Sequence, residues 1–381
     1  MNVLASLGGG VGWLLGYLIP FLLVLTVVVF VHEFGHFWVA RRAGVRVMAF
    51  SIGFGPEIVG FNDRYGTRWK LSAIPLGGYV KFFGDENAAS VPDRDSIDRM
   101  APEDRRVSFF HKSVGARAAI VAAGPIANFL LAIVIFAGLY MTVGRPVLTP
   151  QVDAVQAGGA AEKAGLRAGD IIISIDGTPI ESFGDMQRIV SGSAGRTLEI
   201  EIDRDSRRMI IDATPDLKEV TDTFGNVHSV GILGISRSPG AGGANFQTYG
   251  PVEAVSMGVK EVWFVVERTF SYIGGIATGR EKADQLGGPI RIAQLSGQVA
   301  TLGASALLQF AAYISVSIGL LNLFPVPLLD GGHLLFYAIE AVRGRPLSER
   351  AQEFGFRIGL ALVLMLMLFA AWNDILNISK S

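Results

Sequence analysis

Four long stretches of the chain are mostly apolar and carry no charged residue. They cover residues 3–31, 118–144, 292–329 and 358–373. A helix needs roughly 20 apolar residues to cross the hydrocarbon core of a bilayer, with about 17 as the lower limit. The fourth stretch reaches this length only with uncharged neighbours. The pattern predicts four transmembrane helices, at about 11–37, 118–143, 303–324 and 354–373.

A different pattern follows the first span. Apolar and polar residues partly alternate over residues 50–83, with Gly and Pro at the breaks. This alternation is typical of short strands. Because these strands are apolar for a loop, we expect a β-hairpin or small sheet that dips toward the membrane; a hairpin without membrane contact is the alternative. Residues 85–113 are charged and interrupted by proline, which predicts a solvated loop.

Residues 145–240 are typical of a small separate domain. A short helix bounded by glycines is followed by a strand, a turn at Asp176-Gly177, a segment of helical spacing and a hairpin. This order resembles a PDZ domain of the bacterial protease-associated type, and the segment AGLRAGDIIISIDGTPI is typical of that family. The resemblance implies binding of a peptide C-terminus as an added strand. A spacer domain with an occluded groove is the alternative.

Apolar residues recur at helical spacing over residues 251–280, with five charged residues interspersed between Glu253 and Arg268. These charges disfavour a fifth transmembrane helix. The pattern predicts an amphipathic helix in the plane of the membrane interface, and the region 241–300 is expected to hold this helix and a linker.

Composition agrees with a membrane protein. Half of the residues are hydrophobic and 18% are charged, whereas soluble domains average about 25% charged residues. The net charge of −1 gives no reason to expect a nucleic-acid partner, and the absence of cysteine excludes disulfides and thiolate metal sites. The expected surroundings are therefore a lipid bilayer.

The distribution of Lys and Arg predicts the orientation. Residues 41–117 contain thirteen of them, and the connection between the third and fourth spans contains four more. By the positive-inside rule both loops are cytoplasmic, which leaves both termini and the long region 145–290 on the opposite side. The first apolar run has no preceding basic residue and no small-residue cleavage site, so we expect a retained helix and not a signal peptide.

The first span ends in HEFGH, which begins at His32. On a helix, His32 and His36 lie on one face and can bind one zinc ion, while Glu33 is placed to act as a general base. A catalytic zinc site has three protein ligands and one open position. Each ionisable group in hydrocarbon costs roughly 2.5–3.5 kcal/mol, so packing alone explains three of them poorly.

The third span ends in NLFPVPLLDGGH, in which two prolines break the helix. Broken helices at membrane depth line cavities or are buried in protein. Asp330 and His333 are both candidates for the third ligand, and spacing does not choose between them. Asn322 can stabilise a developing oxyanion or simply join helices. His111 and His228 have no partner at ligand spacing and are expected to be surface or structural residues.

The pair HEFGH and NLFPVPLLDGG resembles the site-2 protease family of intramembrane metalloproteases, and the order of elements is similar to the bacterial regulator-of-sigma-E protease group. Further similar strings are GFGP, PLGGYVKF, AGPIANF and GGPIRIAQ. The resemblance implies zinc held by His32, His36 and Asp330, with Glu33 as general base and Asn322 holding the substrate or the oxyanion. It also implies single-pass membrane protein substrates, such as trimmed anti-sigma factors and remnant signal peptides.

The expected fold class is a polytopic α-helical membrane protein with four transmembrane helices, a membrane-associated sheet and one inserted PDZ domain (α+β). The expected parts are membrane core 1–144, PDZ domain 145–240, interfacial helix and linker 241–300, and membrane core 301–381. In well-known enterobacterial members the corresponding region resembles a tandem pair of PDZ domains, whereas this chain has room for one PDZ domain. The expected location is a bacterial inner membrane, with the active site toward the cytoplasm and the PDZ domain and both termini periplasmic.

Two other functions use the same residues. A zinc transporter or sensor would need more polar residues along its spans, and these spans carry few. A catalytically dead PDZ scaffold would have no use for Glu33 beside the two histidines. Both are weaker interpretations than an intramembrane zinc protease.

Overall fold

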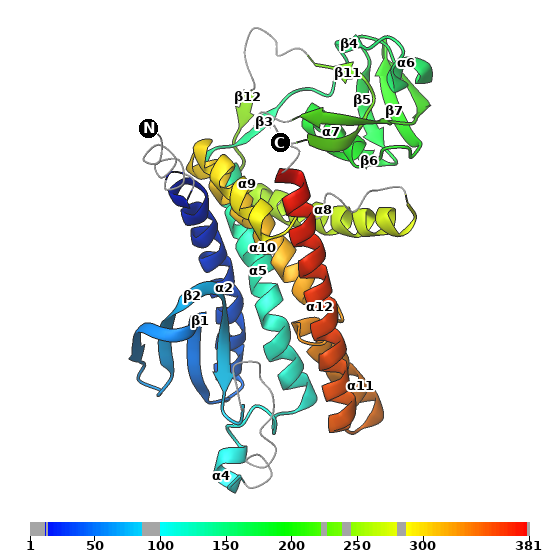
Figure 1. The fold of residues 1–381 in the computed structure, drawn as a ribbon. Coiled ribbons are helices and arrows are strands. Elements are labelled where there is room, and N and C mark those ends of the chain that lie inside the picture. Colours follow the sequence, from blue (N-terminus) through cyan, green and yellow to red (C-terminus); the bar gives the residue numbers. More distant parts are fainter. Residues whose placement is uncertain are drawn as a thin grey trace. The chain divides into compact units, whose positions relative to one another are not determined.

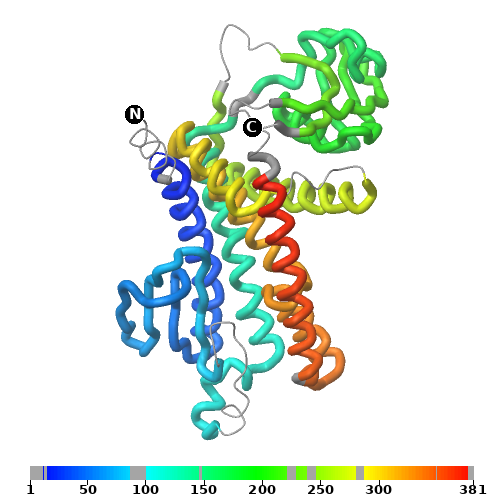
Figure 2. The backbone as a smooth tube through the Cα atoms, viewed as in Figure 1, coloured from blue at the N-terminus to red at the C-terminus, as the bar shows by residue number. Residues whose placement is uncertain are grey.

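The computed structural model describes residues 12, 14–85, 100–221, 227–237, 245–279 and 287–378. The chain forms two compact units that interleave along the sequence (Figures 1 and 2). The first unit comprises residues 1–137, 255–266 and 286–376. The second comprises residues 138–254, 267–285 and 377–381.

The described residues include four helices that are long and apolar enough to cross a membrane. They are α2 (Ile19–Arg42), which follows the short π-helix η1 (Leu14–Leu18), α5 (Val114–Thr142), α10 (Ala304–Asn322) and α12 (Glu349–Ile378). Only 6% of the most apolar window of α12 is buried by the rest of the protein. Exposing such an apolar surface to water would cost free energy, whereas lipid chains around it are equally apolar.

A two-stranded antiparallel sheet follows α2, where a hairpin is predicted. It consists of β1 (Val47–Asn62) and β2 (Arg68–Phe82). One part of this hairpin packs on α2 through a buried aromatic cluster that includes Phe37 and Phe50, with Trp69 at the edge of the cluster. Apolar side chains elsewhere on the hairpin, such as Ile58 and Phe61, are exposed.

The turn of this hairpin is tied to the end of α2. Arg41 donates a hydrogen bond of 2.8 Å to Asp63, and the backbone N–H groups of Tyr65 and Thr67 donate at 2.9 and 3.0 Å. Burial alone raises the pKa of Asp63, but these hydrogen bonds outweigh it and lower the pKa to about 2. The carboxylate therefore stays charged at neutral pH and holds the hairpin in place.

Two further helices of the first unit pack between the long ones. Helix α9 (Pro289–Thr301) lies almost entirely in the region 241–300, where the sequence predicts an interfacial helix and a linker, and ends before the predicted third transmembrane helix. Its first turn is capped by Asp374 of α12, whose carboxylate accepts from the N–H groups of Gly288, Ile290 and Arg291 at 2.8, 3.1 and 3.2 Å. Helix α11 (Asp330–Arg343) connects the third and fourth spans.

The second unit contains a four-stranded antiparallel sheet in the order β6-β5-β7-β8. Its strands are β5 (Ile171–Ile175), β6 (Thr178–Pro179), β7 (Leu198–Arg204) and β8 (Arg207–Ala213). The predicted turn is present, because Asp176 and Gly177 both have positive φ, at 49° and 74°, as a tight hairpin turn requires. Inward-facing side chains such as Ile172, Leu198 and Ile200 form the core.

Smaller elements complete the second unit. They are the strands β3 (Arg145–Val147), β4 (Ala154–Val155), β9 (Asp216–Thr221), β10 (Val227–Ile232), β11 (Ile235–Ser236) and β12 (Asn245–Gln247), and the helices α6 (Ala160–Ala164) and α7 (Phe183–Ser191). Helix α8 (Pro251–Ala277) belongs partly to each unit. Its exposed apolar residues include Val252, Val259 and Trp263.

A buried ion pair in the second unit gives a testable prediction. Asp170 has 1% of its side chain exposed and accepts two hydrogen bonds from Arg204, at 2.7 and 2.8 Å. Burial raises the pKa of Asp170, but the bonds from Arg204 and from the Arg167 backbone outweigh it, so the pKa is lowered. Arg204→Met should destabilise the sheet by about 3 kcal/mol, because an unpaired charge stays buried.

Hydrogen exchange of the β5 and β7 amides in the full chain measures this loss. A folded-state pKa below the unfolded value of about 3.9 means that the pair stabilises the fold fully above that pH and loses its effect as the pH falls further. The difference between Arg204→Met and wild type should therefore shrink below about pH 4. The control is Arg208→Met, because Arg208 is 72% exposed. Equal effects of the two variants at neutral pH would contradict the prediction.

Candidate metal centre

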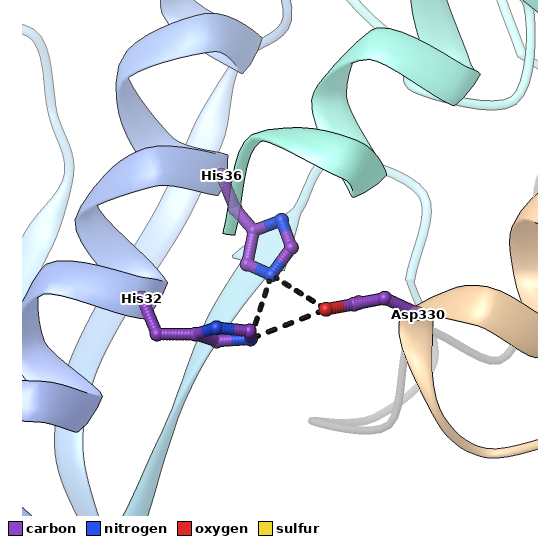
Figure 3. A group of neighbouring side chains, drawn as sticks. All are labelled: His32, His36 and Asp330. Atoms are coloured by element: carbon purple, nitrogen blue, oxygen red, sulfur yellow. Dashed lines mark hydrogen bonds and ion pairs between the residues drawn. The ribbon is translucent and has the colours of Figure 1, made fainter. Parts of the chain in front are cut away.

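Three side chains from two helices meet at one point. His32 and His36 come from α2, and Asp330 is the first residue of α11 (Figure 3). The Nε2 atom of His32 lies 3.2 Å from Nε2 of His36 and 3.2 Å from Oδ2 of Asp330, and His36 Nε2 lies 3.5 Å from the same oxygen. Both histidines are buried, at 8% and 9% exposure. Together the three residues form a group that can hold a metal ion.

Glycines let α2 and α5 approach closely at this point. A Cβ atom at Gly35 would collide with the Ala123 carbonyl oxygen. A Cβ atom at Gly124 would collide with the imidazole of His36 and lie 2.9 Å from Cε1 of His32. The glycine of AGPIANF therefore leaves the room that the two imidazoles occupy.

Replacing Gly124 tests this packing. Gly124→Ala puts a methyl group where the His36 ring lies, so the ring must leave the position in which its Nε2 atom lies 3.5 Å from Asp330. We expect weaker zinc binding by the purified variant, measured by competition with a chelator. The control is Gly138→Ala on the same helix, since a Cβ there meets nothing within 4 Å. Unchanged zinc affinity of Gly124→Ala would show that the ring is not held in this position.

A broken backbone presents Asp330 to the histidines. Helix α10 ends at Asn322, and α11 begins eight positions later, after Pro325 and Pro327. Leu328 has a φ of +94°, which is unfavourable for a side chain other than glycine. A Cβ atom at Gly331 or Gly332 would collide with carbonyl groups of the preceding turn. This tight turn fixes the start of α11 and with it the carboxylate.

The three side chains fit zinc. Ligand atoms in a tetrahedral zinc site with bonds of roughly 2.0–2.1 Å lie roughly 3.3 Å apart, and the three atoms here are separated by 3.2, 3.2 and 3.5 Å. Among the described residues, none gives the buried Oδ2 atom of Asp330 a hydrogen bond. A buried carboxylate oxygen without a donor is unusual, and a cation beside it accounts for it. Two imidazoles and one carboxylate are also a ligand set that zinc prefers.

The two other predicted site residues lie around this group. The amide nitrogen of Asn322 is 3.5 Å from Nε2 of His32. Glu33 is half-buried and lies against β2, because a Cβ atom at Gly78 would come within 3.0 Å of its Cγ atom. The structure therefore gathers His32, Glu33, His36, Asn322 and Asp330 in one place, with β2 beside Glu33.

The remaining histidines lie elsewhere. His333 is on α11, where its ring lies 5.5 Å from that of Phe356, and it is not part of the metal-binding group. His111 is exposed. His228 is in β10, and its side chain lies outside the described part of the structure.

Two contacts that the sequence reasoning missed both come from α5. Nδ1 of His36 donates a hydrogen bond of 2.9 Å to the carbonyl oxygen of Ile120. Nδ1 of His32 lies 3.3 Å from the side-chain amide of Asn128. Asn128 belongs to AGPIANF, a string that the resemblance singled out without a role. An asparagine in the middle of an apolar span is the signal that could have found it.

Comparisons with known proteins match nearly the whole chain. The sequence profile of peptidase family M50 matches residues 20–366. Metalloprotease MmpA of Caulobacter vibrioides is 42% identical over 94% of this chain and 95% of its own length. A protein of Agrobacterium fabrum whose name proposes a zinc metalloprotease is 54% identical over 96% of this chain and 97% of its own length.

Regulator of sigma-E protease RseP of Salmonella typhimurium is 36% identical, over 94% of this chain and 98% of its own length. That alignment runs over 455 positions, more than the 381 residues of this chain, so the relative has residues that this chain lacks. A PDZ domain of an SdrC-like protein from Listeria monocytogenes matches 23% of this chain and 83% of that domain, at 24% identity and a TM-score of 0.18. The PDZ assignment therefore continues to rest on the sequence.

The expected resemblance to site-2 proteases is confirmed by the match to family M50 and by relatives that span nearly the whole chain. Two findings within the described residues agree with it: four helices are long and apolar enough to cross a membrane, and His32, His36 and Asp330 form a group that can hold a metal ion. The chain belongs to peptidase family M50 and is a zinc metalloprotease.

Proposed function

We propose that this protein is an endopeptidase that cleaves peptide bonds within or next to the transmembrane segments of single-pass membrane proteins. The observation that carries the proposal is the position of the metal-binding group. His32 and His36 lie within α2, inside a candidate membrane span, and Asp330 follows the break that ends another span. A zinc ion held inside a membrane span can reach a peptide bond that itself lies in the membrane.

The proposed ligands are His32, His36 and Asp330, and the chemistry follows from their neighbours. Zinc, when bound, polarises the carbonyl under attack and lowers the pKa of a water molecule to roughly 7. Glu33 accepts the proton of the attacking water and returns it to the leaving amine. Asn322, 3.5 Å from His32, donates a hydrogen bond to the oxyanion that develops on the scissile carbonyl.

The sheet beside the site offers a way to hold the substrate. A helical segment hides its amide groups in its own hydrogen bonds, so it must be extended before water can attack. Strand β2 runs past the proposed base, with Gly78 against Glu33. Among the described residues β2 pairs only with β1. We propose that the substrate pairs with β2 as an added strand.

The sequence and the relatives support a cellular location. We place the protein in a bacterial inner membrane, with the site toward the cytoplasm and the 145–240 domain and both termini on the periplasmic side. The positive-inside distribution supports this orientation. The exposed apolar residues of the β1–β2 hairpin and of α8 suit membrane contact. The 145–240 domain, taken as PDZ, receives the C-terminus of a peptide.

The relatives support a substrate class. One of them carries the name regulator of sigma-E protease, which favours trimmed anti-sigma factors, and remnant signal peptides have the same single-span form. The test is a comparison of membrane proteomes from cells with the wild-type enzyme and cells with Glu33→Gln. We expect single-pass stubs to accumulate in the variant. Identical proteomes would contradict the proposal, and a changed cellular zinc content without stubs would favour a transporter.

A further inference from the structure

Asn128 is a fully buried polar residue in an apolar helix. It lies on α5 with 0% exposure, and its side-chain amide is 3.3 Å from Nδ1 of His32. The neighbouring residues Pro125, Ile126, Ala127 and Phe129 are apolar. Burying an amide at membrane depth costs free energy unless its N–H and C=O groups are hydrogen-bonded. The contact with His32 therefore needs a physical explanation.

The direction of this hydrogen bond decides whether His32 can bind a metal. A neutral imidazole carries one hydrogen, and the nitrogen without it is the one that binds. If the Asn128 nitrogen donates to Nδ1, the hydrogen of His32 sits on Nε2, which then cannot be a ligand. If the Asn128 oxygen accepts from Nδ1–H, Nε2 presents its lone pair to His36 and Asp330. The two directions differ by a half-turn of the amide group.

Two observations favour the oxygen as the partner of His32. With the nitrogen facing His32, the buried Oδ1 atom has no hydrogen-bond partner among the described residues, and a half-turn gives it the Nδ1–H donor. The other ligand also follows this rule, because Nδ1 of His36 donates to the Ile120 carbonyl of the same helix at 2.9 Å. Both imidazoles would then carry their hydrogen on Nδ1 and present the lone pair of Nε2 to Asp330, whose Oδ2 atom lies 3.2 and 3.5 Å from these two nitrogens.

We propose that Asn128 is a positioning residue that accepts a hydrogen bond from Nδ1 of His32 and thereby fixes Nε2 as the metal-binding nitrogen. Helix α5 then supplies the outer partner of both histidines, although it supplies no ligand. Such outer partners orient the ring and raise its basicity. The inference rests on the proposed assignment of His32 as a zinc ligand.

The test uses the full-length purified protein and three variants. Asn128→Leu keeps the size of the side chain and removes the hydrogen bond. Asn128→Asp, with the carboxyl ionised, accepts but cannot donate, so it separates the two directions of the bond. Ser315→Ala is the matched control, because the Ser315 hydroxyl donates to the backbone oxygen of Asn128 at 2.8 Å and does not touch His32. Zinc affinity is measured by competition with a chelator, and the bound Co²⁺ spectrum reports the ligand geometry.

We expect Asn128→Leu to bind zinc about 10- to 100-fold more weakly than wild type and to change the Co²⁺ spectrum. Asn128→Asp should bind at least as tightly as wild type, and Ser315→Ala should match it. Wild-type affinity of Asn128→Leu overturns the inference. So does a loss in Asn128→Asp or in Ser315→Ala as large as that in Asn128→Leu.

Two further outcomes are separable. If wild type binds neither zinc nor Co²⁺, the assignment of His32 fails together with the inference. If Asn128→Leu does not fold, Asn128→Asp decides: retained affinity and an unchanged spectrum support the inference, and a tenfold loss overturns it.

Discussion

Glu33→Gln is expected to stop peptide-bond cleavage while zinc stays bound. Glutamine has nearly the shape of glutamate but cannot take the proton of the attacking water. General acid–base catalysis typically contributes about 10²–10⁴-fold, and we expect a loss of that size in the cleavage rate of a single-pass substrate. The zinc content of the purified variant should equal that of wild type, because the metal-binding group consists of His32, His36 and Asp330.

The paired measurement of rate and metal content separates a missing base from a damaged site. Glu267→Gln is a suitable control, because this glutamate lies on α8 and is not a member of the metal-binding group. It should cleave at the wild-type rate. Cleavage by Glu33→Gln at the wild-type rate would contradict its role as base. Loss of zinc from Glu33→Gln would instead make Glu33 part of the metal site.

His32→Ala and Asp330→Ala are expected to lose both zinc and activity. Each removes one of three atoms that lie 3.2–3.5 Å apart, and a zinc site with two protein ligands holds the metal poorly. Zinc content of the purified variants, measured by elemental analysis, should fall close to zero. Asp330→Ala also removes a buried oxygen that has no hydrogen-bond donor among the described residues, so the fold should survive this change.

His333→Ala is the informative control for the third ligand. His333 lies three residues after Asp330 on the same helix, and sequence spacing alone does not distinguish the two. In the structure it packs near Phe356 and stays outside the metal-binding group. His333→Ala should therefore keep its zinc. Full zinc occupancy in Asp330→Ala together with loss in His333→Ala would reverse the assignment.

Much of the membrane part can be predicted from the sequence, because uncharged apolar runs have few alternatives at this length. The four long helices follow from them. Helix α9 does not, because the uncharged stretch from residue 292 to 329 gives no mark of the break. That break lies at Gly303, whose φ is +109°, and the cap comes from Asp374, 86 residues away.

The site could be predicted in part. His32, Glu33 and His36 follow from one short motif on one helix, where spacing fixes the geometry. The choice of Asp330 over His333 as the third ligand depends on the direction in which α11 leaves the broken turn. The local sequence does not determine that direction. The partners of the histidines, Ile120 and Asn128, depend on how α5 packs against α2. Such packing joins residues that are far apart in the sequence.

The most direct test reconstitutes the purified protein in lipid vesicles with a single-pass substrate and locates the cut by mass spectrometry. We expect a zinc-dependent cut inside the apolar segment of the substrate, present with wild type and absent with Glu33→Gln. A cut confined to the soluble flanks of the substrate, or one that Glu33→Gln makes equally well, would contradict this expectation.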